Sequence, residues 1–151
     1  MKEVVFAGAD TNLHTLKADG KLLWQFNTGD EVTQVDVVDM DGDGLDEVVA
    51  CSMSFNVYVV KGDGKTQLWR RDLGEVVRCI SVGDFNGDGK PEVAAGTEDG
   101  IVYLLNNSNG RVMGRHKMEG AILALAAVDV DGDSVVEIVA SSASGDMGVL
   151  K

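Results

Sequence analysis

Three copies of an acidic loop, set at a fixed spacing, constrain the fold of this chain more than any other feature. The copies begin at Asp39, Asp84 and Asp129, so successive loops start 45 residues apart. Each copy places oxygen-bearing side chains at loop positions 1, 3, 5 and 9, as in Asp39-Met40-Asp41-Gly42-Asp43-Gly44-Leu45-Asp46-Glu47. A tight loop with this spacing turns alternate side chains inward, where the main-chain carbonyl of position 7 can join them. Because Ca²⁺ takes about 6–8 oxygen ligands, the pattern favours calcium sites.

The residues around the loops exclude an EF-hand and predict strands instead. An EF-hand needs a bidentate Glu at position 12 and a helix on each side. Position 12 is alanine in all three copies (Ala50, Ala95, Ala140). Each loop follows a short apolar run and precedes a run rich in Val, Ile and Ala, and such runs are typical of strands. We therefore expect each loop to join two β-strands, with the position-9 Glu beginning the second strand.

The repeat extends beyond the loops, with units starting near residues 3, 47, 92 and 137. No segment of helical length shows apolar residues at the helical period. The expected strands are residues 3–8, 13–17 and 22–27, a long strand ending before Asp39, then 47–52, 56–61, 67–72, 76–82, 92–96, 101–106, 111–117, 121–128, 137–142 and 147–151.

Four strands in about 45 residues are the period of a β-propeller blade. We expect an all-β fold in which residues 1–151 form a single propeller segment of about three and a half blades. The segment would hold strands 2–4 of one blade, two complete blades and strands 1–3 of another, with the loop-flanked strand innermost. Trp24 and Trp69 occupy equivalent places on outer strands, where a large ring is expected to cover a seam between blades. The third repeat has Met113 or Gly114 there.

Composition limits the classes of partner. The chain has 151 residues and a formal net charge of −12, which argues against a nucleic acid or an anionic membrane as partner. No apolar run reaches the length of a membrane span, and no signal peptide opens the sequence. We expect Cys51 and Cys79, in strands of adjacent repeats, to be buried free thiols, since positions in neighbouring blades rarely reach disulfide spacing.

At the three loops the chain resembles the calcium-binding repeats of the integrin α-chain propeller and its bacterial relatives, the FG-GAP and VCBS-type repeats. In those families an Asp-x-Asp/Asn-x-Asp-Gly-x-x-Asp/Glu loop joins the two innermost strands of a blade. Carried over by position, the resemblance implies up to three Ca²⁺ sites. Their ligands would be Asp39, Asp41, Asp43, the Leu45 carbonyl and Glu47; Asp84, Asn86, Asp88, the Lys90 carbonyl and Glu92; and Asp129, Asp131, Asp133, the Val135 carbonyl and Glu137.

The sequence departs from that family in two ways. The Phe-Gly and Gly-Ala-Pro signatures are absent, and the nearest counterparts are Val5-Phe6-Ala7-Gly8 and Ala95-Gly96-Thr97, so nothing supports an integrin-like ligand site. Ser134 replaces the position-6 glycine of the other loops, and we expect the third site to be the weakest. A second stretch, Lys17 to Trp24, is similar to the strand-turn-strand repeat of quinoprotein dehydrogenase propellers, which we interpret as shared architecture.

Catalysis finds little support in the sequence. The only histidines, His14 and His116, fall in predicted strands of different blades, and no nucleophile-base arrangement can be assembled around them. We therefore expect a non-enzymatic, calcium-binding propeller module with a structural role or a role in binding a protein or glycan, from an extracellular, periplasmic or cell-envelope protein. The alternative is a fragment of a propeller enzyme such as a polysaccharide lyase or a quinoprotein dehydrogenase.

The strand count bears on assembly. Fourteen strands are too few for a typical closed propeller of 4–8 blades, and the two open blade flanks would expose apolar surface. We expect either self-association, with a dimer closing a six- or seven-bladed ring, or completion by the remainder of a longer propeller.

Overall fold

The computed structural model describes residues 3–151, so Met1 and Lys2 of the predicted segment lie outside the described residues. Fourteen strands and no helix are found in this part of the chain. The strands are β1 (Glu3–Ala7), β2 (Asn12–Lys17), β3 (Leu22–Asn27), β4 (Val32–Val38), β5 (Glu47–Ser52), β6 (Asn56–Val60), β7 (Gln67–Asp72), β8 (Val77–Gly83), β9 (Glu92–Thr97), β10 (Ile101–Leu105), β11 (Val112–Lys117), β12 (Ile122–Val128), β13 (Glu137–Ser142) and β14 (Met147–Leu150).

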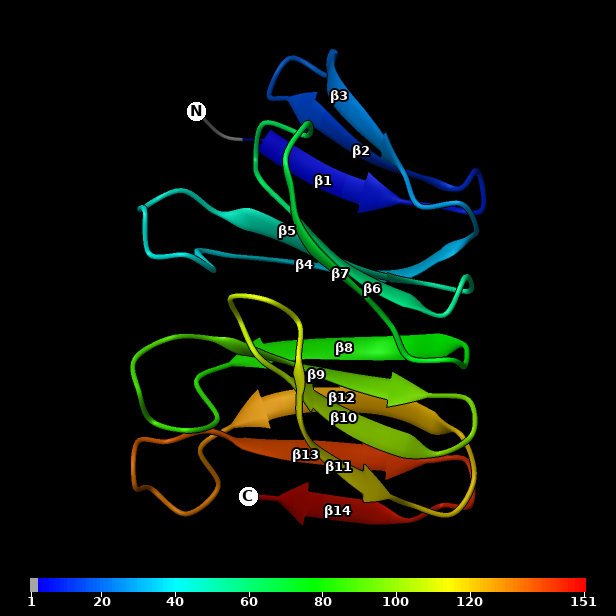
Figure 1. Cartoon of the computed structure of the whole chain (residues 1–151), viewed down its shortest axis with the longest axis vertical. Helices are drawn as coiled ribbons and strands as arrows, with labels where there is room; N and C mark the ends of the chain where they lie inside the picture. Colours follow the sequence, from blue (N-terminus) through cyan, green and yellow to red (C-terminus); the bar gives the residue numbers. More distant parts are fainter. Residues whose placement is uncertain (1–2) are drawn as a thin grey trace.

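The strands form four antiparallel sheets, which we call the first to fourth blades. Their orders are β1-β2-β3, β4-β5-β6-β7, β8-β9-β10-β11 and β12-β13-β14. Figure 1 shows the blades stacked one after another along the longest axis of the molecule. The predicted division into three, four, four and three strands is therefore confirmed, and the strand boundaries agree with the predicted ones to within one or two residues.

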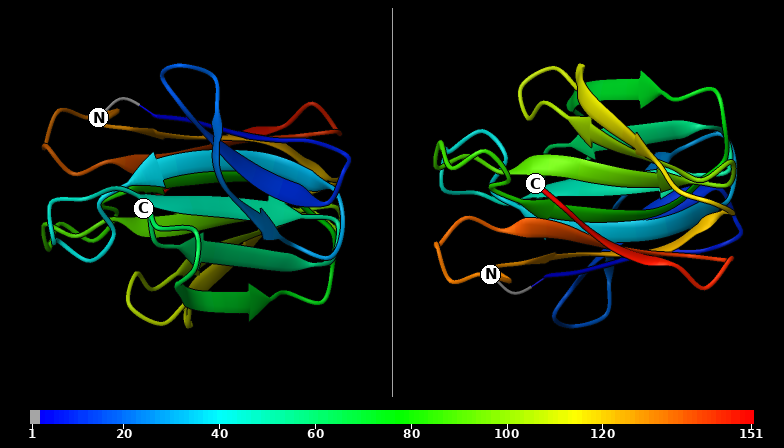
Figure 2. Two further views of the ribbon diagram at one scale, coloured as in Figure 1. Left: turned by 90° about the horizontal axis from the view of Figure 1, so that it is seen from above. Right: turned by 90° about the horizontal axis from the view of Figure 1, so that it is seen from below.

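The first strand of each complete blade lies innermost, as predicted. Strand β8 packs against both β4 and β12, the corresponding strands of its two neighbours. The views along the stack show successive blades overlying one another with a progressive rotation (Figure 2). At the other edge of its blade β11 is exposed at every residue, whereas β5, β6 and β9 are buried at every residue. Both faces of the central strands are covered by neighbouring blades, so these strands are continuously apolar rather than alternating.

The seams between blades form the core. One cluster joins the second and third blades through side chains such as Val57, Val59, Ile80 and Val93. A second joins the third and fourth blades around Ile122 and Ile138, and a third joins the first and second around Leu13 and Val48. Each blade thus uses one face for each neighbour, because successive side chains of a strand point to opposite faces.

Two tryptophans cover seams, as the sequence predicts. The indole N–H of Trp24 donates to the Gly62 carbonyl at 2.8 Å, and that of Trp69 donates to the Asn107 carbonyl at 2.6 Å. Each ring of one blade therefore lies on the β-turn of the next. A Cβ added at Gly110 would lie 2.5 Å from the Trp69 ring, and φ there is +63°, so glycine is required on both counts.

The third blade has a glycine at the tryptophan position. Val59 pairs with Trp69 in the second blade, and Leu104, its equivalent, pairs with Gly114 in the third. The register therefore selects Gly114 rather than Met113. A hollow of about 380 Å³ lies there, lined by residues that include Leu104, Gly114 and Ile138. The seam between the third and fourth blades is thus less completely filled than the seam under Trp69.

Cys51 and Cys79 are buried free thiols, as expected. Burial raises the pKa of Cys51 to about 12 and that of Cys79 to about 11. Over residues 3–151 the structure contains no helix long and apolar enough to cross a membrane.

Candidate metal centres

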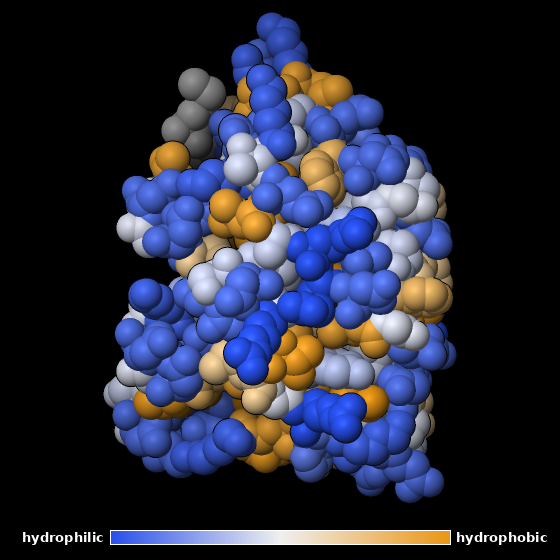
Figure 3. Space-filling model, viewed as in Figure 1, coloured by the Kyte–Doolittle hydropathy of each residue, from blue (hydrophilic) through white to orange (hydrophobic). Residues whose placement is uncertain are grey.

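The three acidic loops project from the same edge of the molecule, on the left of Figure 1. They connect β4 to β5, β8 to β9 and β12 to β13, so each joins the two innermost strands of a blade. The surface over this edge is mainly hydrophilic in Figure 3. The propeller therefore presents three equivalent candidate sites side by side, as successive blades repeat the same connection. We call them sites 1, 2 and 3 in chain order.

The first aspartate of each loop fixes the backbone of that loop. In site 1 the two carboxylate oxygens of Asp39 accept from Gly42 N at 2.7 Å and from Gly44 N at 2.9 Å. The aspartates of sites 2 and 3, Asp84 and Asp129, accept from the same two loop positions. An aspartate that accepts from backbone N–H groups a few residues later is a common device for closing tight turns.

The remaining loop residues repeat a second set of hydrogen bonds. The position-5 aspartate accepts from the position-7 N–H, as Asp43 does from Leu45 at 2.9 Å; Asp88 and Asp133 do the same. The position-9 glutamate accepts from the position-2 N–H, as Glu47 does from Met40 at 2.9 Å, and Glu92 and Glu137 follow. The three loops thus share one conformation, and the side chains at positions 1, 3, 5 and 9 gather on its inner side.

Ligand atoms converge in two of the three sites. Carboxylate oxygens of Asp39, Asp41 and Asp43 lie within 4.8 Å of one another, as do those of Asp129, Asp131 and Glu137. In site 2 the Asn86 amide N–H₂ instead donates to Glu92 Oε1 at 3.0 Å and to Asp88 Oδ2 at 3.3 Å. Carboxylate and amide oxygens are the hard donors that Ca²⁺ and Mg²⁺ take, so the residues present fit a hard divalent cation.

The three loop glutamates are the most buried members of the sites. Their exposed fractions are 1% for Glu47, 1% for Glu92 and 2% for Glu137. Burial raises the pKa of Glu47, and the charge of Asp41 adds to that effect. Burial also raises the pKa of Glu92, with Asp88 and Asp84 adding to it. In both cases loss of hydration is the main cause and the neighbouring aspartates add to it, and the positive charge of a bound cation would offset both.

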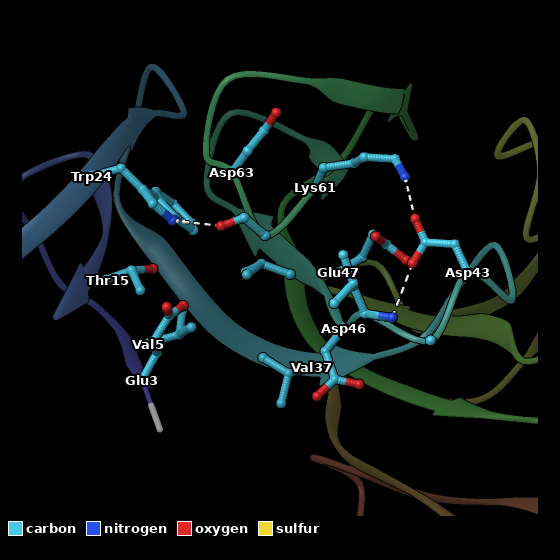
Figure 4. Close-up of a pocket in the computed structure, with 14 residues that line it drawn as sticks. Glu3, Val5, Thr15, Trp24, Val37, Asp43, Asp46, Glu47, Lys61 and Asp63 are labelled. Atoms are coloured by element: carbon cyan, nitrogen blue, oxygen red, sulfur yellow. Dashed lines mark hydrogen bonds and ion pairs between the residues drawn. The ribbon is translucent and has the colours of Figure 1, made fainter. Parts of the chain in front are cut away.

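Two lysines that the sequence analysis did not single out contact the sites. Lys61 Nζ lies 2.8 Å from Asp43 Oδ2, a contact that Figure 4 shows. It also lies 2.8 Å from Asp41 Oδ2. Lys151 Nζ pairs with Asp131 and lies 3.1 Å from Glu137 Oε1. The hydrogen bond from Lys61 holds the pKa of Asp43 below its usual range, and the bond from Lys151 does the same for Asp131. The sequence does contain a sign of these contacts, because Lys61 and Lys151 lie the same number of residues after the glutamates of their loops, Glu47 and Glu137.

Ser134 adopts the backbone conformation that position 6 requires. Its φ is +73°, close to the +85° of Gly44 and the +83° of Gly89. The sequence argument that this position needs a left-handed residue is therefore confirmed. The weakness of site 3 as a metal site stays a prediction, as do the ligand roles of the Leu45, Lys90 and Val135 carbonyls.

A cavity of about 590 Å³ lies beside site 1, in the seam between the first and second blades. Its lining includes Trp24 and Thr15 from the first blade and Glu47 and Lys61 from the second (Figure 4). The Thr15 hydroxyl is buried and finds no hydrogen-bond partner within residues 3–151. Thr15 pairs with Trp24 as Val59 pairs with Trp69 in the second blade. The first seam therefore has a hydroxyl where the second seam has a methyl group.

The histidines lie apart, on strands of different blades, as predicted. His14 on β2 pairs with Asp10 at 2.6 Å and stacks on Phe6, and His116 lies on β11. The pairing with His14 lowers the pKa of Asp10.

Comparisons with known proteins agree with this architecture. Residues 84–140 match the model of the FG-GAP-like repeat, a range that contains the loops of both site 2 and site 3. No curated protein matches the sequence significantly.

Solved structures, among them a WD40 β-propeller domain, superpose on the chain at low sequence identity. BBS1N in complex with ARL6DN gives a TM-score of 0.78 at 15% identity, covering 97% of this chain and 42% of that chain. The computationally designed Ika4 protein gives 0.79 at 19% identity, covering 99% and 84%. The WD40 β-propeller domain of Doa1 gives 0.78 at 20% identity, covering 97% and 46%. The chain thus spans less than half the length of two of these three structures. It is a β-propeller chain that carries an FG-GAP-like repeat at residues 84–140.

Proposed function

We propose that this chain is a calcium-binding, non-enzymatic propeller module in which Ca²⁺ holds the three loops and stabilises the fold. The single observation that carries the proposal is the shared loop geometry, which brings three carboxylates together in site 1 and three in site 3. With four carboxylates in site 1 and a buried Glu47 among them, the folded chain holds repulsion that a divalent cation offsets. Calcium is favoured over Mg²⁺ because each loop offers several protein oxygens in an irregular arrangement, whereas Mg²⁺ usually keeps several waters in a regular octahedron.

Calcium titration with thermal melts tests this proposal. A ligand that binds only the folded state stabilises it by about 2.7 kcal/mol per site at a hundredfold excess over Kd. For a domain of this size that corresponds to a rise in Tm of about 5–11 °C per occupied site. We expect millimolar Ca²⁺ to raise Tm well above its value in EDTA, and equal Tm values in the two conditions would refute the proposal.

Glu47→Gln and Asp46→Asn form a matched pair for the same experiment. Both changes remove one negative charge at adjacent positions, but only Glu47 is buried in site 1, whereas Asp46 is exposed. We expect Glu47→Gln to reduce the rise in Tm with calcium and Asp46→Asn to leave it close to that of the wild type. Equal responses of the two variants would indicate a general charge effect rather than coordination.

The module would work where free calcium is abundant, in an extracellular or cell-envelope protein, because binding modules in such places tolerate Kd values of about 10⁻⁴–10⁻³ M. The FG-GAP-like repeat supports this assignment. A role in binding a protein or glycan is part of the proposal. The alternative, a fragment of a propeller enzyme, predicts turnover in a panel of glycans and polyuronates, where the proposed module would give binding without product.

We propose further that a second copy of the chain covers the two open flanks. The fourth blade ends in a face whose apolar side chains are exposed, with Met147 at 77%, although the equivalent Val57 inside the stack is at 0%. The first blade ends in the complementary face, where Val4 is 57% exposed and its equivalent Val48 is at 2%. The exposed side chains of the two flanks are thus equivalent to side chains that are buried in the seams between successive blades of the chain.

Joining the fourth blade of one copy to the first blade of another would bury both faces as the internal seams do, apart from the innermost strand that the first blade lacks, and two such contacts close a ring. A ring of six or seven blades, as the strand count predicts, requires the three-stranded terminal sheets of the two copies to share blades, and a ring in which each of the four sheets per chain stays separate has eight. Eight is within the range of closed propellers.

Light scattering coupled to size exclusion tests the assembly, given a protomer of 16.0 kDa. We expect a dimer in calcium, and we expect Met147→Asp to give a monomer. Met113→Asp is the control, because Met113 is exposed on the outermost strand of the third blade, away from both flanks. A folded wild-type monomer at high concentration would refute self-association and leave the remainder of a longer propeller as the missing partner.

A further inference from the structure

Sites 1 and 3 each have a lysine at the same place in the repeat, and site 2 does not. Lys61 and Lys151 come directly after β6 and β14, the strands that pair with the glutamate-bearing strands β5 and β13. The equivalent residue in the third blade, directly after β10, is Asn106. Its side-chain oxygen accepts from the backbone N–H and the hydroxyl of Ser108, so this side chain is engaged in the local turn.

The lysines contact the residues expected to hold the cation. Lys61 bridges Asp41 and Asp43 with two N–O distances of 2.8 Å, and its side chain is 30% exposed. Lys151 bridges Asp131 and Glu137 and lies 3.6 Å from Asp133. An ammonium group in these positions neutralises the same oxygens that a divalent cation would use.

Site 2 satisfies the same oxygens in another way. Its position-3 residue is Asn86 rather than aspartate, and the Asn86 amide donates to Glu92 and Asp88. Sites 1 and 3 each have four carboxylates and one ammonium, whereas site 2 has three carboxylates and an amide. These expected ligands and lysines therefore sum to a formal charge of −3 in each site, and the loops also contain Asp46 in site 1 and Lys90 in site 2. The extra aspartate and the lysine occur together, in two repeats of three.

We propose that Lys61 and Lys151 are built-in cations that compete with calcium for the carboxylates of sites 1 and 3. This inference rests on the proposed calcium function. Calcium must move the ammonium group away before it can take the Asp41 and Asp43 oxygens, whereas in site 2 only a neutral amide has to turn. Displacement of the ammonium therefore lowers the apparent calcium affinity of sites 1 and 3, and the lysines hold these two loops together at low calcium.

The inference predicts opposite effects of one substitution in the two metal states. Lys61→Met keeps the length of the side chain but removes its charge, so the four carboxylates of site 1 lose their counter-ion. We expect Tm in EDTA to fall and the calcium affinity of site 1 to rise about fivefold to tenfold at low ionic strength, less in salt. The difference in Tm between calcium and EDTA therefore widens.

Two further variants make the test specific. Asn106→Lys places the ammonium beside site 2, so we expect Tm in EDTA to rise and the calcium affinity of site 2 to fall. Lys17→Met is the matched control, because Lys17 has the same place relative to Glu3 as Lys61 has relative to Glu47. Among the described residues no aspartate loop precedes Glu3, so Lys17 has no candidate metal site beside it. We expect this control to change calcium affinity less than twofold.

Isothermal titration of calcium into each protein, together with melts in EDTA and in calcium, measures both effects. A loss of calcium affinity in Lys61→Met would overturn the inference, because it would make the lysine a supporting partner of the bound ion. Unchanged affinity in both Lys61→Met and Asn106→Lys, with normal binding in the wild type, would overturn it while leaving the calcium function intact. Absence of calcium heat in the wild type would refute both.

Discussion

Replacing Ser134 with glycine tests how much the third loop is strained by its side chain. Ser134 has φ +73°, in the left-handed region where a residue with a Cβ is disfavoured by about 1–2 kcal/mol. Its N–H donates to Asp129 at 3.0 Å, so the loop holds it in this conformation through the same bond that Gly44 and Gly89 make in their loops. Ser134→Gly removes the strain without removing the bond.

The net gain is smaller than the strain. Glycine gives the unfolded chain more freedom, which opposes folding by about 0.5–1 kcal/mol. We therefore expect Ser134→Gly to stabilise the fold by about 0.5–1 kcal/mol, a rise in Tm of about 1–4 °C for a domain of this size. Because the strain belongs to the loop itself, the rise should appear in EDTA as well as in calcium.

Gly44→Ser in site 1 is the reverse substitution and serves as its control. An added Cβ at Gly44 meets nothing within 4 Å, so its effect comes from the backbone at φ +85° and not from a clash. We expect a fall in Tm of similar size. Calcium titration of both variants tests whether site 3 is the weakest site. Strain that is already present in the metal-free loop changes Tm without changing affinity, so tighter binding in Ser134→Gly, by up to about tenfold, would show that the serine also hinders calcium binding. If Ser134→Gly does not raise Tm and Gly44→Ser does not lower it, the strain argument is wrong.

Two further predictions concern the core. Trp69→Phe keeps a ring over Gly110 but leaves the Asn107 carbonyl without its indole donor, so we expect a loss of about 1–3 kcal/mol by chemical denaturation; a loss below about 0.5 kcal/mol would mean that water replaces the indole. Burial raises the pKa of Cys51 to about 12, so we expect neither thiol to react with a disulfide reagent at pH 8 until the chain unfolds, and rapid labelling of the native protein would contradict this.

The blade architecture could be predicted because the information is local. The acidic loops recur at a constant interval, the apolar runs between them have strand length, and Asp-Gly or Asn-Gly pairs mark the turns. Each predicted strand is present, and the glutamates at residues 3, 47, 92 and 137 each begin one. The assignment of Trp24 and Trp69 to seams followed from the same periodicity, because equivalent positions in successive blades meet equivalent neighbours.

The details that escaped prediction depend on contacts between strands. Whether Met113 or Gly114 takes the tryptophan position depends on an irregularity in register between Leu104 and Leu105. The sequence pattern does not predict this irregularity. The pairing of Lys61 with Asp41 and Asp43 depends on where a side chain beyond the end of β6 comes to lie relative to a loop on the far side of β5.

The three seams differ in how well they are filled, and this difference should govern how the chain opens. Trp69 closes the seam between the second and third blades over an apolar cluster, whereas the first seam holds a cavity of about 590 Å³ and an unpartnered Thr15 hydroxyl, and the third has Gly114 and a hollow of about 380 Å³. Stacked repeats unfold by losing nearest-neighbour interfaces, so the weaker seams should separate first. We expect hydrogen exchange of the monomeric Met147→Asp variant to be slowest in β5, β6 and β9 and faster in β2 and β13. Uniform protection across the four blades would mean that the seams open together, and that their filling does not set the order.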